Sequence, residues 1–387
     1  MIEFLSAVPK SVLAHREVLP EGTLGKHVRA YAVEGQLPDF SDKGFVILGI
    51  LENRNDVDYM GEQLSFDAFR KALYSLYPGN WSQPVYDIGD IKAGETVEDT
   101  YFAMRTVVEA LLKANLIPII LGGSQDLVYA QYRAYDSHGS MVNMVNVDTN
   151  FDLGDAEKPI SSKSYVGKII VDQPYNLFNY STLGYQSFYN PPGEIALMEK
   201  LYFDAYRLGE VTADITAVEP ILRDADIVTV DLGAVSSGVL GHKGMKSPNG
   251  FDGREICAIT RYAGISNRVS SFGVYQLKDF SDAVSGAMLV AQMIWYFMEG
   301  VNFRVADEDF DNEDQYTTYK VPVDDEVLVF KKSQKTGRWW IELPFISNVN
   351  NKLKRRTLLP CTYGDYLSAT NQEIPERWYK ARRKNEV

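Results

Sequence analysis

The chain has 387 residues, 45% of them hydrophobic, and is therefore long enough to bury a large core in one or more domains. Its formal net charge of -13 argues against general nucleic-acid binding, because the phosphate backbone attracts basic surfaces. The only cysteines, Cys257 and Cys361, lie far apart, which excludes a disulfide framework and a CxxC metal motif.

The start of the chain and its apolar runs predict a protein that neither enters nor crosses a membrane. Residues 1–9 lack the basic region and the longer apolar stretch of a signal peptide. The longest apolar run, residues 287–298, is shorter than a helix that spans a bilayer. We therefore expect a soluble, cytoplasmic protein without a membrane partner.

Short apolar, β-branched runs alternate with helical patterns through the first three hundred residues. The runs that we predict to be strands are residues 45–51, 85–88, 117–121, 141–147, 227–230 and 271–277. Several of these runs are apolar throughout, which is typical of parallel strands covered on both faces.

Two helices have clear boundary signals. Thr96 and Asp99 form a potential capping box, which predicts a helix that runs to about Asn115. Apolar residues at three-four spacing predict another helix over residues 284–298, with Ser281 or Asp282 as its cap and Gly300 as its end.

The alternation of strands and helices predicts an α/β fold, a three-layer α/β/α arrangement around a doubly wound, mostly parallel sheet. We divide the chain into an N-terminal segment (1–44), an α/β core (45–300) and a C-terminal extension packed on the core (301–387). Within the extension, residues 326–330 and 338–343 flank a Lys-Thr-Gly turn and predict a β-hairpin. Trp339 and Trp340 fall on opposite faces, so we expect one to pack on the core and the other to serve an oligomer or partner contact.

Three polar stretches follow predicted strands, where an open parallel sheet places its ligand site. They are Leu-Gly-Gly-Ser-Gln-Asp at 121–126, Val-Asp-Thr-Asn-Phe-Asp at 147–152 and Val-Asp-Leu-Gly at 230–233. Each stretch alone is also explained by folding, because paired glycines make tight turns and an aspartate can cap a helix. Their order and spacing together favour common ancestry with a known family.

Taken in order, Asp87-Ile-Gly-Asp90, Gly122-Gly123, Asp148-Thr-Asn-Phe-Asp152 and Asp231 resemble the ureohydrolase superfamily, which includes arginases, agmatinases and formimidoylglutamases. The resemblance covers residues 45–300 and implies an arginase-like fold. Phe151, Leu153, the Ser-Pro-Asn-Gly-Phe stretch at 247–251 and Arg254-Glu255 are most similar to formimidoylglutamases.

The resemblance implies two manganese ions held by Gly-Gly-x-His, Asp-x-His-x-Asp and Asp-x-Asp motifs, but half of the ligands differ. Gln125 and Asn150 stand in the places of two histidines, and Gly233 stands in the place of an aspartate. The remaining ligands, Asp148, Asp152 and Asp231, match. Neutral amides bind first-row metals more weakly than imidazole does, and glycine offers no ligand. We therefore expect that the binuclear centre, which would ionise a bridging water, is lost.

The same resemblance places Gln276 where a glutamate would hold the cationic group of the substrate, and Lys278 two residues further along the same strand face. Without an ion, the three matching aspartates would repel one another. We hypothesise that Lys278 or Arg254 reaches into the vacated metal site and neutralises them.

Two functional interpretations stay open. We favour a catalytically inactive homologue without a cofactor, which has a binding, scaffold or regulatory role toward an unknown protein or small molecule. The alternative is a metal-dependent hydrolase of C–N bonds in formimidoylglutamate, a guanidino compound or an amide. It would use one manganese, magnesium or calcium ion on Asp148, Asp152, Asp231 and Gln125. Neither interpretation predicts a nucleic-acid partner, and a homo-oligomer stays open.

Overall fold

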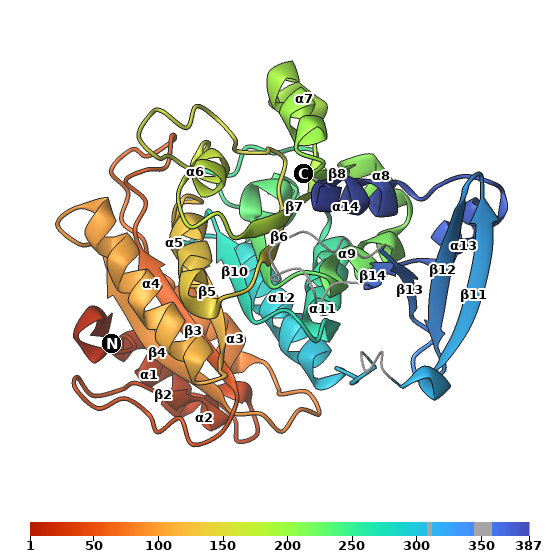
Figure 1. Cartoon of the computed structure of the whole chain (residues 1–387). Helices are drawn as coiled ribbons and strands as arrows, with labels where there is room; N and C mark the ends of the chain where they lie inside the picture. Colours follow the sequence, from red (N-terminus) through yellow and green to blue (C-terminus); the bar gives the residue numbers. More distant parts are fainter. Residues whose placement is uncertain (308–311, 344–357, 387) are drawn as a thin grey trace.

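A largely parallel sheet lies between two layers of helices in the computed structural model of the chain (Figure 1). The structure describes residues 1–307, 312–343 and 358–386. Within these residues the central sheet has ten strands in the order β1-β4-β3-β5-β10-β9-β6-β7-β8, with β2 beside β4. Only β1 is antiparallel to its neighbour. The strands are β1 (Leu5–Ser6), β2 (Arg29–Ala30), β3 (Phe45–Leu51), β4 (Val85–Lys92), β5 (Ile117–Gly122), β6 (Val142–Val147), β7 (Leu177–Tyr185), β8 (Asp204–Arg207), β9 (Ile227–Asp231) and β10 (Ser271–Tyr275).

Each face of the sheet has its own hydrophobic core and its own helices. One face is covered by α1 (Lys10–Val18), α2 (Leu24–His27), α3 (Asp67–Ser75), α8 (Leu208–Ala213), α9 (Glu219–Arg223), α10 (Ser237–Leu240), α11 (Gly253–Ile265) and α12 (Val284–Asn302). The other is covered by α4 (Val97–Lys113), α5 (Leu127–Arg133), α6 (Tyr165–Val171) and α7 (Pro192–Lys200). In β3, Phe45 and Ile47 face the first core and Val46 and Leu48 the second, so the strand is apolar throughout. The predicted α/β/α layers are confirmed.

The two predicted helix boundaries have different outcomes. The capping box of α4 is confirmed, because the Asp99 N–H donates to Thr96 Oγ1 and the Thr96 N–H donates to Asp99 Oδ2. The predicted start of α12 at Val284 is confirmed, but the predicted cap and end are wrong, since Ala283 is the N-cap and the helix continues through Gly300 to Asn302. A Cβ at position 300 would lie 2.3 Å from the carbonyl oxygen of Arg261, so Gly300 serves the close crossing of α11 and α12.

By length and composition alone, α12 could cross a membrane, but 61% of its most apolar window is buried inside the structure. It packs against α11 and α3 in the first helical layer. This burial is typical of the core helix of a large α/β protein.

The C-terminal extension forms a second, antiparallel sheet against the core (blue in Figure 1). Its strands and helices are β11 (Tyr316–Val323), β12 (Glu326–Ser333), β13 (Trp339–Glu342), β14 (Leu358–Cys361), α13 (Tyr363–Thr370) and α14 (Glu376–Glu386), and a short 3₁₀ turn at Glu313–Gln315 precedes β11. The rest of the chain contains further 3₁₀ turns at Ile2–Phe4, Asp136–His138, Ser187–Tyr189, Ile215–Val218 and Leu232–Ala234. The predicted hairpin is confirmed as β12–β13, whose turn contains Gly337 with φ +75°.

The two tryptophans of β13 both lie in buried surroundings. Trp340 lies under the guanidinium of Arg223 from α9, 4.4 Å from the ring centroid, and Arg223 donates to the Trp339 carbonyl oxygen at 3.0 Å. Trp339 stacks on Tyr319 and on Tyr366 of the extension, whose rings also contact each other, and is 7% exposed. The expectation that one of them faces a partner is therefore wrong, because α13 covers that face with its own aromatic residues.

Candidate functional site at the ends of the central strands

The polar residues singled out in the sequence meet where the central strands end. Gln125 follows β5, Asp148 follows β6 and Asp231 ends β9. In the register of neighbouring strands, Val147 lies opposite Val230, which places Asp148 and Asp231 side by side. Gln276 follows β10, which lies between β5 and β9. The predicted site is therefore one place in space, at the carboxyl ends of parallel strands.

Three buried carboxylates form the centre of this place. Asp148, Asp152 and Asp231 are 0%, 2% and 3% exposed. Burial, and then repulsion from Asp152, raises the pKa of Asp148 well above its ordinary value. Burial raises the pKa of Asp152 to about 6, and burial with repulsion from Asp148 raises that of Asp231 to about 7. Carboxylates crowded in this way need a cation or a proton beside them.

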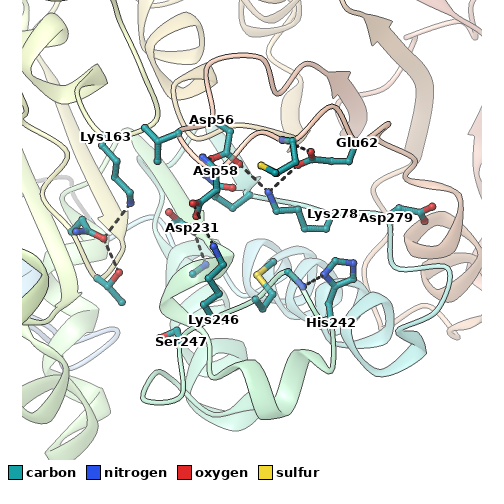
Figure 2. A pocket seen from close by; sticks show the side chains of 18 of the residues that line it. Asp56, Asp58, Glu62, Lys163, Asp231, His242, Lys246, Ser247, Lys278 and Asp279 are labelled. Carbon is teal, nitrogen blue, oxygen red and sulfur yellow. Dashed lines mark hydrogen bonds and ion pairs between the residues drawn. The ribbon is translucent and has the colours of Figure 1, made fainter.

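A lysine that the sequence analysis did not single out supplies a cation. Lys163 lies in the loop before α6, and its Nζ is 3.3 Å from Asp152 Oδ1. The same ammonium donates to Asn150 Oδ1 at 3.2 Å (Figure 2). Burial opposes its charged form, but attraction from Asp152, Asp148 and Asp231 outweighs this effect and raises the pKa of Lys163. Lys163 is therefore protonated at neutral pH.

The two cations that the sequence analysis assigned to this role lie elsewhere, so that hypothesis is wrong in its residues. Lys278 Nζ lies 2.9 Å from Asp56 Oδ2 (Figure 2). Arg254 is 94% exposed and pairs with Asp252 at the start of α11. The strand alternation that would have aimed Lys278 at the carboxylates ends at Tyr275, because Gln276 has a left-handed backbone with φ +57°.

The amide of Gln125, the counterpart of the first implied histidine, is only half satisfied. Its Nε2 donates to Asn146 Oδ1 at 3.2 Å and to the Tyr165 hydroxyl at 3.3 Å. Its Oε1 is buried and has no hydrogen-bond partner among the described residues. Such an oxygen is available to a bound group.

The residues at the other two implied ligand positions that differ are already engaged or have no side chain. Asn150 Oδ1 accepts from Lys163 and from Thr149 Oγ1, while Nδ2 donates to the Tyr189 carbonyl oxygen at 3.0 Å. Gly233 has no side chain, and its N–H donates to Asp231 Oδ1 at 2.6 Å. A Cβ at position 233 would lie 3.0 Å from that same oxygen.

A cavity of about 580 Å³ opens beside these groups. Asn150, Lys163, Asp231 and Gln276 line it together with the loops around Asp56 to Gln63 and His242 to Ser247, with Thr149, Gly233, Lys278 and Asp279. Its walls carry the ion pair Lys246–Asp58 at 3.4 Å beside the Lys278–Asp56 pair (Figure 2). Of the three carboxylates, Asp231 lines this cavity, so a small molecule in it could reach the site at Asp231.

The donor set does not fit two manganese ions. The Asn150 oxygen is bonded to an ammonium, Gly233 offers no ligand, and Lys163 adds a positive charge at Asp152. Within residues 1–307, 312–343 and 358–386, no group of three or more His, Cys, Asp or Glu side chains is arranged to hold a metal ion. The oxygens of Gln125 and the three aspartates are hard donors, so any ion that they attracted would be a hard cation.

Comparison with known proteins places the fold in a family. The model of the arginase family matches residues 43–299, most of the core that holds the carboxylate site. The chain belongs to the arginase family. Two curated relatives of this arginase-family chain are the formimidoylglutamases of Corynebacterium efficiens and of a Geobacillus species. The first is 26% identical over 66% of this chain and 85% of the relative, and the second is 24% identical over 64% and 80%. The resemblance to formimidoylglutamases is confirmed.

Solved structures show the same arginase-like fold. A formiminoglutamase of Trypanosoma cruzi, solved with Mn²⁺, superposes with a TM-score of 0.62 at 18% identity, covering 70% of this chain and all of that one. The formimidoylglutamase of Bacillus subtilis superposes with a TM-score of 0.63 at 15% identity, covering 76% and 99%. At these identities the likeness concerns the fold, and the site has to be judged on its own residues.

Proposed function

We propose that this arginase-family chain is a catalytically inactive relative of formimidoylglutamases that keeps the ancestral pocket as a binding site. It would act in a binding, scaffold or regulatory role, without a binuclear manganese centre. The observation that carries this proposal is the Lys163 ammonium, which bonds to Asn150 and lies 3.3 Å from Asp152 at the position of the implied metal ligands.

The chemistry of the family supports this proposal. Paired divalent ions make hydroxide available at neutral pH by lowering the pKa of a bound water to about 7. An ammonium donates hydrogen bonds but has no empty orbital for a water oxygen, so Lys163 supplies charge without generating a nucleophile. Hydrolysis of an amidine C–N bond would then lack its attacking group.

The lining of the pocket supports a changed ligand. Gln276 replaces the glutamate that the resemblance implies for the cationic substrate group, so charge-assisted pairing is lost at that point. The charges of Lys246 and Lys278 are compensated by Asp58 and by Asp56. We infer that the pocket selects its ligand by polar contacts and shape more than by net charge.

A second candidate function has one specific observation in its favour. The buried Gln125 Oε1 has no hydrogen-bond partner among the described residues and belongs to the same donor set as the three buried aspartates. A single magnesium, calcium or manganese ion bound there would make the chain a hydrolase of C–N bonds with an oxygen-ligated metal.

A hydrolysis assay separates the two candidates. Purified protein, incubated with Mn²⁺, Mg²⁺ or Ca²⁺, is offered formimidoylglutamate, arginine and agmatine, and the release of formamide, urea and ammonia is measured. We expect no release above the protein-free blank, because without a binuclear metal centre no paired ions would ionise a water. Turnover that depends on one of these metals and disappears in Asp148→Ala would establish the second candidate and refute the first. A metal-loaded formimidoylglutamase serves as the positive control.

A further inference from the structure

We propose that Lys163 is a built-in substitute for the missing metal charge. Its ammonium supplies one positive charge to the cluster of Asp148, Asp152 and Asp231 through its ion pair with Asp152, and it holds Asn150 in place, so that the floor of the pocket keeps its shape without an ion. This inference rests on the proposed loss of the metal centre and assigns the compensating residue.

The buried carboxylate cluster needs a positive charge beside it. Three carboxylates that are at most 3% exposed share one place, and unpaired buried charge is strongly unfavourable. Among the residues that the structure describes, Lys163 is the one lysine or arginine with an ion pair to any of the three. Two other lysines that line the cavity form ion pairs with other acids, Lys278 with Asp56 and Glu62, and Lys246 with Asp58.

Lys163 also connects two loops of the site. It joins the loop that follows β6 to the loop that precedes α6, through Asp152 and Asn150 at once. Asp152 has a left-handed backbone with φ +54°, a conformation that is uncommon outside glycine and that aspartate adopts more readily than most residues. The Val166 N–H donates to the Asp152 carbonyl oxygen at 3.1 Å, so the backbone of Asp152 is also bonded to α6. The ion pair therefore helps to hold the turn at Asp152.

Lys163 and a metal ion would exclude each other from the carboxylate cluster. An ammonium and a divalent ion on the same carboxylates repel each other strongly at low local dielectric. The Lys163 side chain is 39% exposed. If its ammonium were removed, the space beside Asp152 would therefore be open to solvent and to dissolved ions. Removing this charge should therefore weaken the cluster and, at the same time, open it to a cation from solution.

Thermal unfolding of four proteins tests this inference: the wild type, Lys163→Met, Lys158→Met and the double variant Asp152→Asn with Lys163→Met. Lys158 is the matched control, because it lies in the same loop region but is 75% exposed and pairs with the exposed Asp155. With a chelator present, we expect Lys163→Met to lower the Tm by about 5 °C and Lys158→Met to lower it by less than about 1 °C. The double variant should regain at least half of the loss, because it removes one charge of each sign.

The same proteins are then measured with excess MnCl₂ in place of the chelator. We expect the Tm of Lys163→Met to rise and the Tm of the wild type to stay within error, because only the variant presents uncompensated carboxylates. A Lys163→Met protein that is as stable as the wild type in chelator overturns the inference, and so does an equal manganese effect on both.

If Lys163→Met alone gives no soluble protein, the double variant decides. Soluble double variant supports charge compensation, and loss of solubility in both contradicts it. Failure of the proposed function is a separate result, since it would appear as metal-dependent turnover or as tightly bound metal in the wild type.

Discussion

Manganese is expected to bind stoichiometrically to a variant that combines Gln125→His, Asn150→His, Gly233→Asp and Lys163→Met. The first three substitutions supply the two imidazoles and the carboxylate that the resemblance implies, and the fourth removes the competing ammonium. A pair of unit charges 4 Å apart interacts by about 4 kcal/mol near a protein surface, which corresponds to roughly a thousandfold in Kd. The variant that retains Lys163 should therefore bind manganese at least about a hundredfold more weakly.

Titration calorimetry with MnCl₂ on both variants measures this difference. Position 233 needs its own control, because a Cβ there would lie 3.0 Å from Asp231 Oδ1 and the 3₁₀ turn has to adjust. The same set without Gly233→Asp shows whether that adjustment limits binding. If all variants fold and none binds manganese, the correspondence of Gln125 and Asn150 with the implied histidines is wrong.

Replacing Arg70 with methionine is expected to lower the free energy of unfolding by about 3–5 kcal/mol. Arg70 is fully buried, and its guanidinium lies 2.8 Å from Asp87 Oδ2 and 2.9 Å from Asp90 Oδ1 and donates to the Gly89 carbonyl oxygen at 3.0 Å. Methionine keeps much of the volume but leaves two buried carboxyl groups without their cation. The Asp87-Ile-Gly-Asp90 stretch, which helped to establish the family resemblance, thus serves the core.

Urea unfolding followed by circular dichroism gives this value. Lys113→Met is the control, since Lys113 is 62% exposed and pairs with Glu109 one helical turn away, a contact worth at most about 0.5 kcal/mol. A loss for Arg70→Met no larger than that of the control would mean that the buried ion pair contributes nothing to the fold.

Local sequence patterns predicted an element well where its burial or its cap alone determined its residues. β3 and β5 are apolar throughout because both faces are covered, and α4 is bounded by its Thr96 capping box. Patterns failed where tertiary contacts decide. Gly300 is typical of a helix end but lies inside α12, at the crossing with α11. The strand β7 was not predicted, because it carries polar residues such as Asn179 and Ser181, which bond to Asp204 of the edge strand.

The site was predictable in its backbone positions and only partly in its side chains. The strand ends place Gln125, Asp148, Asp231 and Gln276 together, since parallel strands share an edge. The compensating cation was not predictable, because Lys158 and Lys163 stand in the same polar stretch and no local pattern distinguishes them. Only the path of the loop before α6 brings Lys163, and not Lys158, to Asp152.

The metal content of the unmodified protein tests the central claim most directly. The protein is purified without chelators from cells supplied with manganese, and its bound metals are counted by mass spectrometry. If Lys163 has taken over the charge of the lost ions, manganese, magnesium and calcium should each stay far below one ion per chain. One or two tightly held ions per chain, lost on replacing Asp148 or Asp231 by alanine, would contradict the account.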